Sequence, residues 1–149
     1  MDLRYLIATI HILTFGLGFA SCWMRASALG KLKDQSGVDA VLFADNLWGI
    51  AALLWILTGL WRAFGGLEKG SEFYLHNAAF LVKMSLFILV FALEMRPMIT
   101  FIKWRIQKTK GLTIDLSSAQ SLSRISYLEL ILLIPIVFMA TAMARGIFY

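Results

Sequence analysis

The stretch LRYLIATIHILTFGLGFASCWM, Leu3 to Met24, decides the fold class of this chain. After Arg4 it contains no Asp, Glu, Lys or Arg, and His11 is its one basic side chain. An apolar run of this length matches the roughly 20 residues that a helix needs to cross a bilayer. The sequence therefore predicts a membrane-spanning helix over about residues 5–24.

One face of this predicted helix differs from the others. Steps of three, four and seven residues from His11 reach Thr14, Phe15 and Gly18, whereas the other faces carry Leu, Ile and Phe. Small and polar stripes on membrane helices pack against neighbouring helices. We therefore expect this face to lie inside a helix bundle, and His11 is the first candidate functional residue.

The composition of the whole chain supports a membrane protein. Of its 149 residues, 60% are hydrophobic and 15% are charged, whereas soluble domains have about 45–50% apolar and about 25% charged residues. The net charge is +5, but most cations flank hydrophobic stretches, which is typical of topology signals and not of nucleic-acid binding. We predict a single membrane domain over residues 1–149.

Three more hydrophobic stretches complete an all-α, integral membrane bundle of four transmembrane helices. Asn77 is a candidate N-cap of the third helix, and Pro97 suggests a bend where that helix leaves the membrane. A basic interfacial segment is expected after it, over about 98–110. The predicted spans are about 5–24, 41–61, 78–95 and 125–144.

The distribution of cations predicts the topology. Four spans place both termini on one side, where the cations near the membrane are Arg4, Arg62, Lys69 and Arg145. The connections on the other side carry nine cations: Arg25, Lys31, Lys33, Arg96, Lys103, Arg105, Lys108, Lys110 and Arg124. Cytoplasmic connections are enriched in Lys and Arg. We therefore expect these basic connections in the cytoplasm and the termini outside.

A first group of ionisable residues is expected near the cytoplasmic boundary, with members from all four helices: Arg25, Asp45, Glu94, Arg96 and Glu129. We interpret this group as a structural charge layer in which Arg25, Arg96 and Arg124 neutralise the three carboxylates through bidentate pairs. The carboxylates could instead bind a divalent metal. No Glu-x-x-His spacing accompanies them, so we favour the structural layer.

A second group is expected on the outer side: His11, Arg62, Lys83 and Arg145. These residues could form an anion site, with His11 as proton donor or metal ligand. A haem b would fit such a site, with propionates on the cations, iron on His11, and a second axial ligand from His76, Met84 or Met143. Alternatively, the cations extend to lipid headgroups and His11 is a satisfied core residue.

Several local patterns resemble an uncharacterised family of small bacterial four-helix inner-membrane proteins. They include Asp45-Asn-Leu-Trp-Gly49, Gly59-Leu-Trp-Arg62 and Ala144-Arg145-Gly146. This resemblance implies a location in the bacterial inner membrane.

More distantly, the chain is similar to the haem-containing membrane protoporphyrinogen oxidases and the copper-resistance membrane proteins. The shared features are His11, Arg25 and the run Phe80-Leu-Val-Lys83. This resemblance implies a haem-linked role for His11 and a catalytic role for Lys83.

Three functions are compatible with these patterns. The leading hypothesis is a haem-binding, redox-related inner-membrane protein. The second is a small anion or proton transporter in which the two charged layers are gates. The third is a non-catalytic accessory subunit. The expected partners are the lipid bilayer and either further copies of the chain or a larger membrane complex, without nucleic acid. The sequence leaves open whether the protein is an enzyme.

Overall fold

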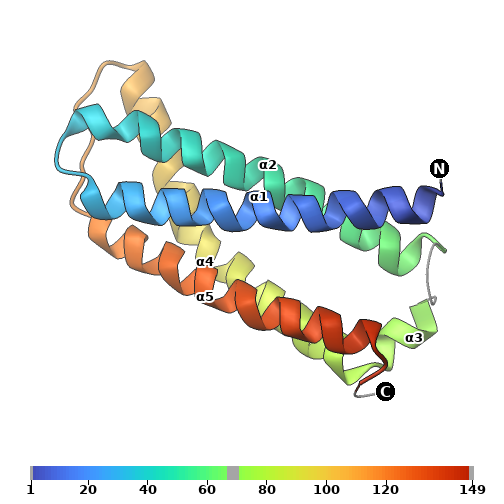
Figure 1. Cartoon of the computed structure of the whole chain (residues 1–149). Coiled ribbons are helices and arrows are strands. Elements are labelled where there is room, and N and C mark those ends of the chain that lie inside the picture. Colours follow the sequence, from blue (N-terminus) through green and yellow to red (C-terminus); the bar gives the residue numbers. More distant parts are fainter. Residues whose placement is uncertain (1, 67–70, 148–149) are drawn as a thin grey trace.

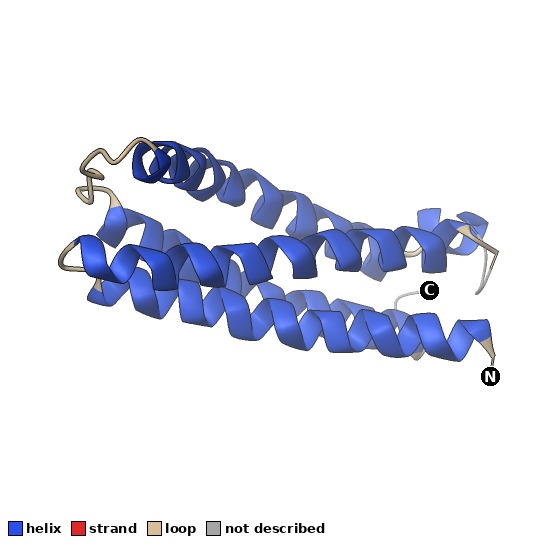
Figure 2. Ribbon diagram, turned by 90° about the horizontal axis from the view of Figure 1, so that it is seen from above, coloured by secondary structure: helices blue, strands red, loops and turns tan. Residues whose placement is uncertain are grey.

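The computed structural model describes residues 2–66 and 71–147, which form four long helices and two short ones (Figure 1). In the described residues all regular structure is helical (Figure 2). All four long helices are long and apolar enough to cross a membrane. The predicted fold class is confirmed. The elements are α1 (Leu3–Lys31), η1 (Gln35–Gly37), α2 (Val38–Phe64), α3 (Ser71–Leu75), α4 (Ala78–Thr109) and α5 (Ala119–Ala144).

The helices run up and down, so that the bundle has two distinct ends (Figure 1). The α1–α2 and α4–α5 connections lie at one end, which we call the loop end. The start of α1, the end of α5 and the short helix α3 lie at the other, which we call the terminal end. α1 packs against α2 and α5, and α4 packs against α5. Figure 1 shows α1 and α5 side by side at the loop end and separating toward the terminal end.

Hydrogen bonds between α1 and α5 explain why these helices meet at the loop end. The Cys22 thiol lies 3.3 Å from the backbone oxygen of Ser126, and the Ser123 hydroxyl donates to the backbone oxygen of Ala26 at 2.8 Å. Both contacts join the second half of α1 to the first turns of α5. Such interhelical hydrogen bonds are a main source of helix association where lipid surrounds the bundle.

The helices extend beyond the predicted spans, most clearly α4. Its start agrees with the sequence, because the Asn77 side chain accepts a hydrogen bond from the Phe80 backbone N–H at 3.1 Å. Its end does not, because α4 continues through Pro97 to Thr109, and the basic segment expected separately over 98–110 is its last part. Phe101 and Trp104 are buried in the core at the loop end, which holds the helix together beyond the proline.

The core consists of three apolar clusters along the bundle. The loop-end cluster contains Leu29, Val41, Phe101, Trp104 and Leu122, among others. The middle cluster is built from Cys22, Trp48, Val90, Leu133 and Ile136. The terminal-end cluster contains Ala63, Tyr74 and Phe80. Many large apolar side chains point outward instead, for example Leu13 and Phe138, each 68% exposed. This is the arrangement expected of a bundle whose surroundings are hydrocarbon.

Gly18 allows α1 and α2 to approach closely. A Cβ atom built on Gly18 would lie 3.3 Å from the Trp48 ring and 3.5 Å from the Ala51 Cβ, whereas one built on Gly16 would meet nothing within 4 Å. We expect Gly18→Val to force the helices apart and to reduce the free energy of unfolding by about 1–3 kcal/mol, the usual cost of overpacking. Thermal unfolding in detergent, followed by tryptophan fluorescence, measures this change.

Gly16→Val is the matched control, because it makes the same substitution on the same helix where there is open space. It should change the free energy of unfolding by less than about 0.5 kcal/mol. An equal decrease in the free energy of unfolding of Gly18→Val and Gly16→Val would show that helix propensity, and not close packing at Gly18, causes the destabilisation.

Candidate functional site

The guanidinium of Arg25 is completely buried and bonds to residues of α2, α4 and α5. Nη1 donates to Asp45 Oδ1 at 2.9 Å and to Glu94 Oε1 at 2.8 Å. Nη2 donates to Glu94 Oε2 and to Glu129 Oε2, both at 2.7 Å. Nε donates to the Ser126 hydroxyl at 3.1 Å. An arginine has five N–H bonds, and here each has an acceptor.

Two aromatic rings complete the surroundings of Arg25. Its guanidinium carbon lies 5.7 Å from the ring centres of both Trp48 and Phe101. Arg25 is therefore held by three carboxyl groups and contacted by two aromatic rings, which add a cation–π contribution. Removing one partner of such a buried ion pair typically costs about 3–5 kcal/mol, because the other charges remain buried without compensation.

The second cation of this site is Arg105, which the sequence did not single out. Its Nη2 donates to Asp45 Oδ2 at 2.6 Å and to Asn46 Oδ1 at 2.8 Å. The spacing could have revealed it, because Arg105 follows Glu94 by three helical turns and so shares its face. We call Arg25, Asp45, Glu94, Arg105 and Glu129 the Arg25 cluster.

Arg96 and Arg124 do not take part in this cluster, contrary to the predicted pairing. Both side chains are exposed, and neither forms an ion pair with any described residue. Arg96 follows Glu94 by two residues, and positions two apart on a helix point to different faces.

On the terminal side, His11 is fixed by Thr58 of α2. Its Nδ1 lies 2.8 Å from the Thr58 hydroxyl oxygen, which itself lies 2.7 Å from the backbone oxygen of Leu54. The hydroxyl has one proton, which it donates to Leu54 because a carbonyl oxygen can only accept. The Thr58 oxygen therefore accepts from the His11 Nδ1–H. In the neutral imidazole this leaves the lone pair on Nε2.

His11 is half-buried and faces α2. Its ring centre lies 5.8 Å from that of Trp55. A Cβ atom on Gly59 would lie 3.3 Å from His11 Cε1, so the glycine provides the space that the imidazole occupies. The position of the ring thus depends on the contact between α1 and α2.

The three cations predicted around His11 come from different helices at the terminal end. Arg62 lies one turn after Thr58 in the last turn of α2. The Lys83 ammonium lies 5.1 Å from the centre of the Phe80 ring in the second turn of α4. Arg145 is exposed and caps the end of α5. The structure thus places all three at the same end of the bundle as His11.

The candidate second axial ligands occupy two different environments. Met84 and Met143 pack together with the terminal-end cluster around Ala63 and Phe80. His76 is exposed, with its Nδ1 2.9 Å from the backbone oxygen of Glu72. In the described ranges, no three side chains of His, Cys, Asp or Glu converge as a metal site.

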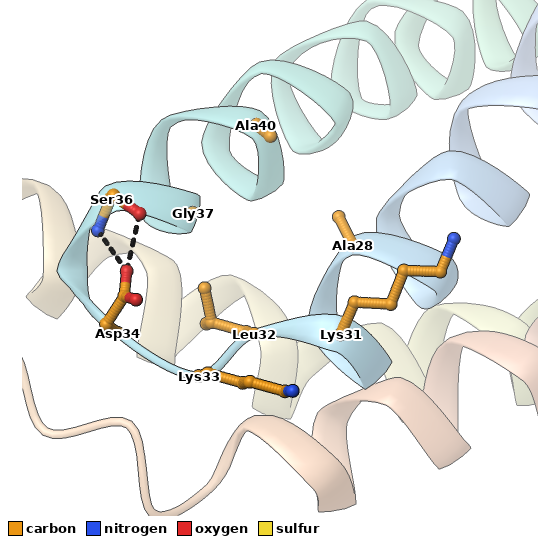
Figure 3. Close-up of a pocket in the computed structure, with 8 residues that line it drawn as sticks. All are labelled: Ala28, Lys31, Leu32, Lys33, Asp34, Ser36, Gly37 and Ala40. Carbon is orange, nitrogen blue, oxygen red and sulfur yellow. Dashed lines mark hydrogen bonds between the residues drawn. The ribbon is translucent and has the colours of Figure 1, made fainter.

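A hollow of about 320 Å³ lies at the loop end between α1 and α2 (Figure 3). Asp34 on its rim accepts hydrogen bonds from the Ser36 hydroxyl and from the Ser36 backbone N–H, and these bonds lower the pKa of Asp34. None of the candidate residues above lines the hollow. Its lining is Ala28, Lys31, Leu32, Lys33, Asp34, Ser36, Gly37 and Ala40.

Removal of Arg25 should destabilise the whole bundle. We expect Arg25→Ala to reduce the free energy of unfolding by about 3–5 kcal/mol, because three carboxyl groups, of which Glu129 is completely buried, lose their common cation. Arg96→Ala, which removes an exposed arginine, should change it by about 0.5 kcal/mol or less. Thermal unfolding in detergent with size-exclusion chromatography compares the two variants, and similar losses in both would contradict a central role for Arg25.

Comparison with known proteins places the chain in one family. The family model described as "Predicted membrane protein (DUF2214)" matches residues 3–148. No curated protein and no solved structure is found to match the chain. The matched range includes all four long helices, as expected from the sequence patterns. This protein therefore belongs to the DUF2214 family of predicted membrane proteins.

Proposed function

We propose that this protein is a haem b-binding, redox-related protein of the bacterial inner membrane, in which His11 would bind the iron. The observation that carries the proposal is the hydrogen bond between His11 Nδ1 and the Thr58 hydroxyl at 2.8 Å. Histidines that bind metals almost always donate their other ring N–H to a fixed acceptor. A donated Nδ1–H bond to Thr58 would leave Nε2 as the nitrogen available to bind iron, which supports the proposal.

The cations at the terminal end support the same proposal. Arg62, Lys83 and Arg145 are suited to bind the two propionates of a haem or the acidic groups of a substrate. Lys83 is the residue that we propose for catalysis. When bound, haem supplies one-electron redox chemistry, which these side chains cannot provide themselves.

If a second residue binds the iron, a methionine would suit this role better than His76. Met84 and Met143 are half-buried in the terminal-end cluster, whereas the His76 side chain is 77% exposed. Histidine–methionine ligation is one of the haem coordination types known in electron-transfer proteins.

The decisive measurement is the absorption spectrum of the protein purified in detergent from haem-sufficient cells, before and after dithionite. We expect a Soret band near one haem per chain in the wild type, and its loss in His11→Ala. Thr58→Val removes the acceptor of the Nδ1–H and should weaken haem affinity about 10–100-fold.

His76→Ala is the control variant, because it removes the other histidine from an exposed position. It should retain the spectrum of the wild type. A colourless wild type, or a Soret band that survives in His11→Ala, would overturn the haem proposal.

We also propose that the loop end faces the cytoplasm, on the basis of the nine-to-four distribution of cations. Alkaline phosphatase is active only outside the cytoplasm, and green fluorescent protein fluoresces only inside it. Phosphatase fused after Tyr149 should be active, and phosphatase inserted at Leu112 should be inactive, with the fluorescent fusions giving the opposite result. The reverse pattern would invert the topology.

A further inference from the structure

The Arg25 cluster contains more carboxyl groups than cations. Its two cations are Arg25 and Arg105, and its three carboxyl groups belong to Asp45, Glu94 and Glu129. If all five groups were ionised, the cluster would carry one net negative charge. An uncompensated charge inside a membrane bundle is costly, and such residues generally have a function.

The hydrogen bonds show which carboxyl group is least compensated. Both oxygens of Asp45 accept from arginine, at 2.9 and 2.6 Å. Both oxygens of Glu94 accept from Arg25, at 2.8 and 2.7 Å. Glu129 is bound to Arg25 by Oε2 alone, at 2.7 Å. Glu129 is also the most deeply buried of the three, since its side chain is 0% exposed, against 12% for Asp45 and 17% for Glu94.

The second oxygen of Glu129 has no hydrogen-bond partner in the described part of the chain. Arg25 cannot provide one, because its five N–H bonds are already used. The Cys22 thiol is directed to the backbone oxygen of Ser126 instead. A buried carboxylate oxygen without a donor costs free energy, and a buried unsatisfied group in a native structure requires an explanation.

We propose that Glu129 is a proton-binding site, with the proton on Oε1. One proton taken up from water makes the Arg25 cluster neutral and turns the unpartnered acceptor into a carboxylic acid hydroxyl, while Oε2 still accepts from Arg25. Release returns the proton to water and leaves a cluster with one net negative charge. This inference is independent of haem and of His11, so it goes beyond the proposed function.

Glu94 connects Glu129 to the surface. The two carboxyl groups accept from the same Arg25 nitrogen, Nη2, at 2.7 Å each, and Glu94 is partly exposed whereas Glu129 is not. Glu94 is therefore the group that we assign to the route by which a proton leaves Glu129. The other charged groups around this site are Arg25 on α1, Asp45 on α2 and Arg105 on α4, and none of their contacts reaches Oε1.

Infrared spectroscopy of the purified full-length protein in lipid tests the proposal directly. We expect the carbonyl stretch of a protonated carboxylic acid at neutral pH, with a shift to lower frequency in D₂O. The band should disappear in Glu129→Gln and persist in Glu72→Gln, a control in which an exposed glutamate is changed. Absence of the band from the wild type, or its persistence in Glu129→Gln, would overturn the proposal.

Thermal unfolding distinguishes a protonated Glu129 from an ionised Glu129 and from one that binds a metal cation. Glutamine resembles a protonated glutamate in shape and charge, so Glu129→Gln should leave Tm nearly unchanged, while Glu94→Gln should lower it by several degrees. A decrease in Tm for Glu129→Gln as large as that for Glu94→Gln would show that Glu129 is ionised and would overturn the proposal. If Glu94→Gln fails to fold, the comparison of Glu129→Gln with the wild type is sufficient. A Tm that falls when choline replaces Na⁺ would identify a bound cation and overturn the proposal.

Discussion

The guanidinium of Arg25 is the interaction on which the arrangement of the helices depends. Apolar side chains gain little by moving from lipid to a helix contact, so directional bonds decide how membrane helices pack. Arg25 on α1 binds Asp45 on α2, Glu94 on α4 and Glu129 on α5. One side chain thus connects all four long helices. The contacts between α1 and α5 lie in the same half, which explains why these helices meet at the loop end and separate beyond it (Figure 1).

The terminal end has a different organisation, because His11 depends on a single helix pair. Its position is fixed by Thr58 and by the space at Gly59, both on α2. Between the two ends, the Trp55 ring contacts Phe15 and Phe87 at centroid distances of 5.5 and 5.9 Å, and so joins α1, α2 and α4. A tightly connected loop end therefore supports a terminal end where α1 and α5 lie apart (Figure 1).

The sequence predicted how far along a helix each charged residue lies better than it predicted the helix face on which that residue lies. Hydropathy located the four helices, and the cap pattern located the start of α4 at Asn77. Counting residues placed Arg25, Glu94 and Glu129 at one depth, and the structure brings them together. The same count selected Arg96 and not Arg105, which binds Asp45 in the structure. The helix face on which a residue lies and the reach of an arginine side chain matter more here than nearness in sequence. The bond between His11 and Thr58 joins residues 47 positions apart, so no local pattern could reveal it.

The distance between the two sites limits how they can act together. His11 and Arg25 are fourteen residues apart on α1, which corresponds to about 21 Å along the helix. The core between them is the apolar middle cluster around Trp48, Val90 and Leu133. The middle cluster thus separates the Arg25 cluster from His11 along the bundle. The proton site that we propose at Glu129 and the ligand site that we propose at His11 are therefore two separate sites, one toward each end of the bundle.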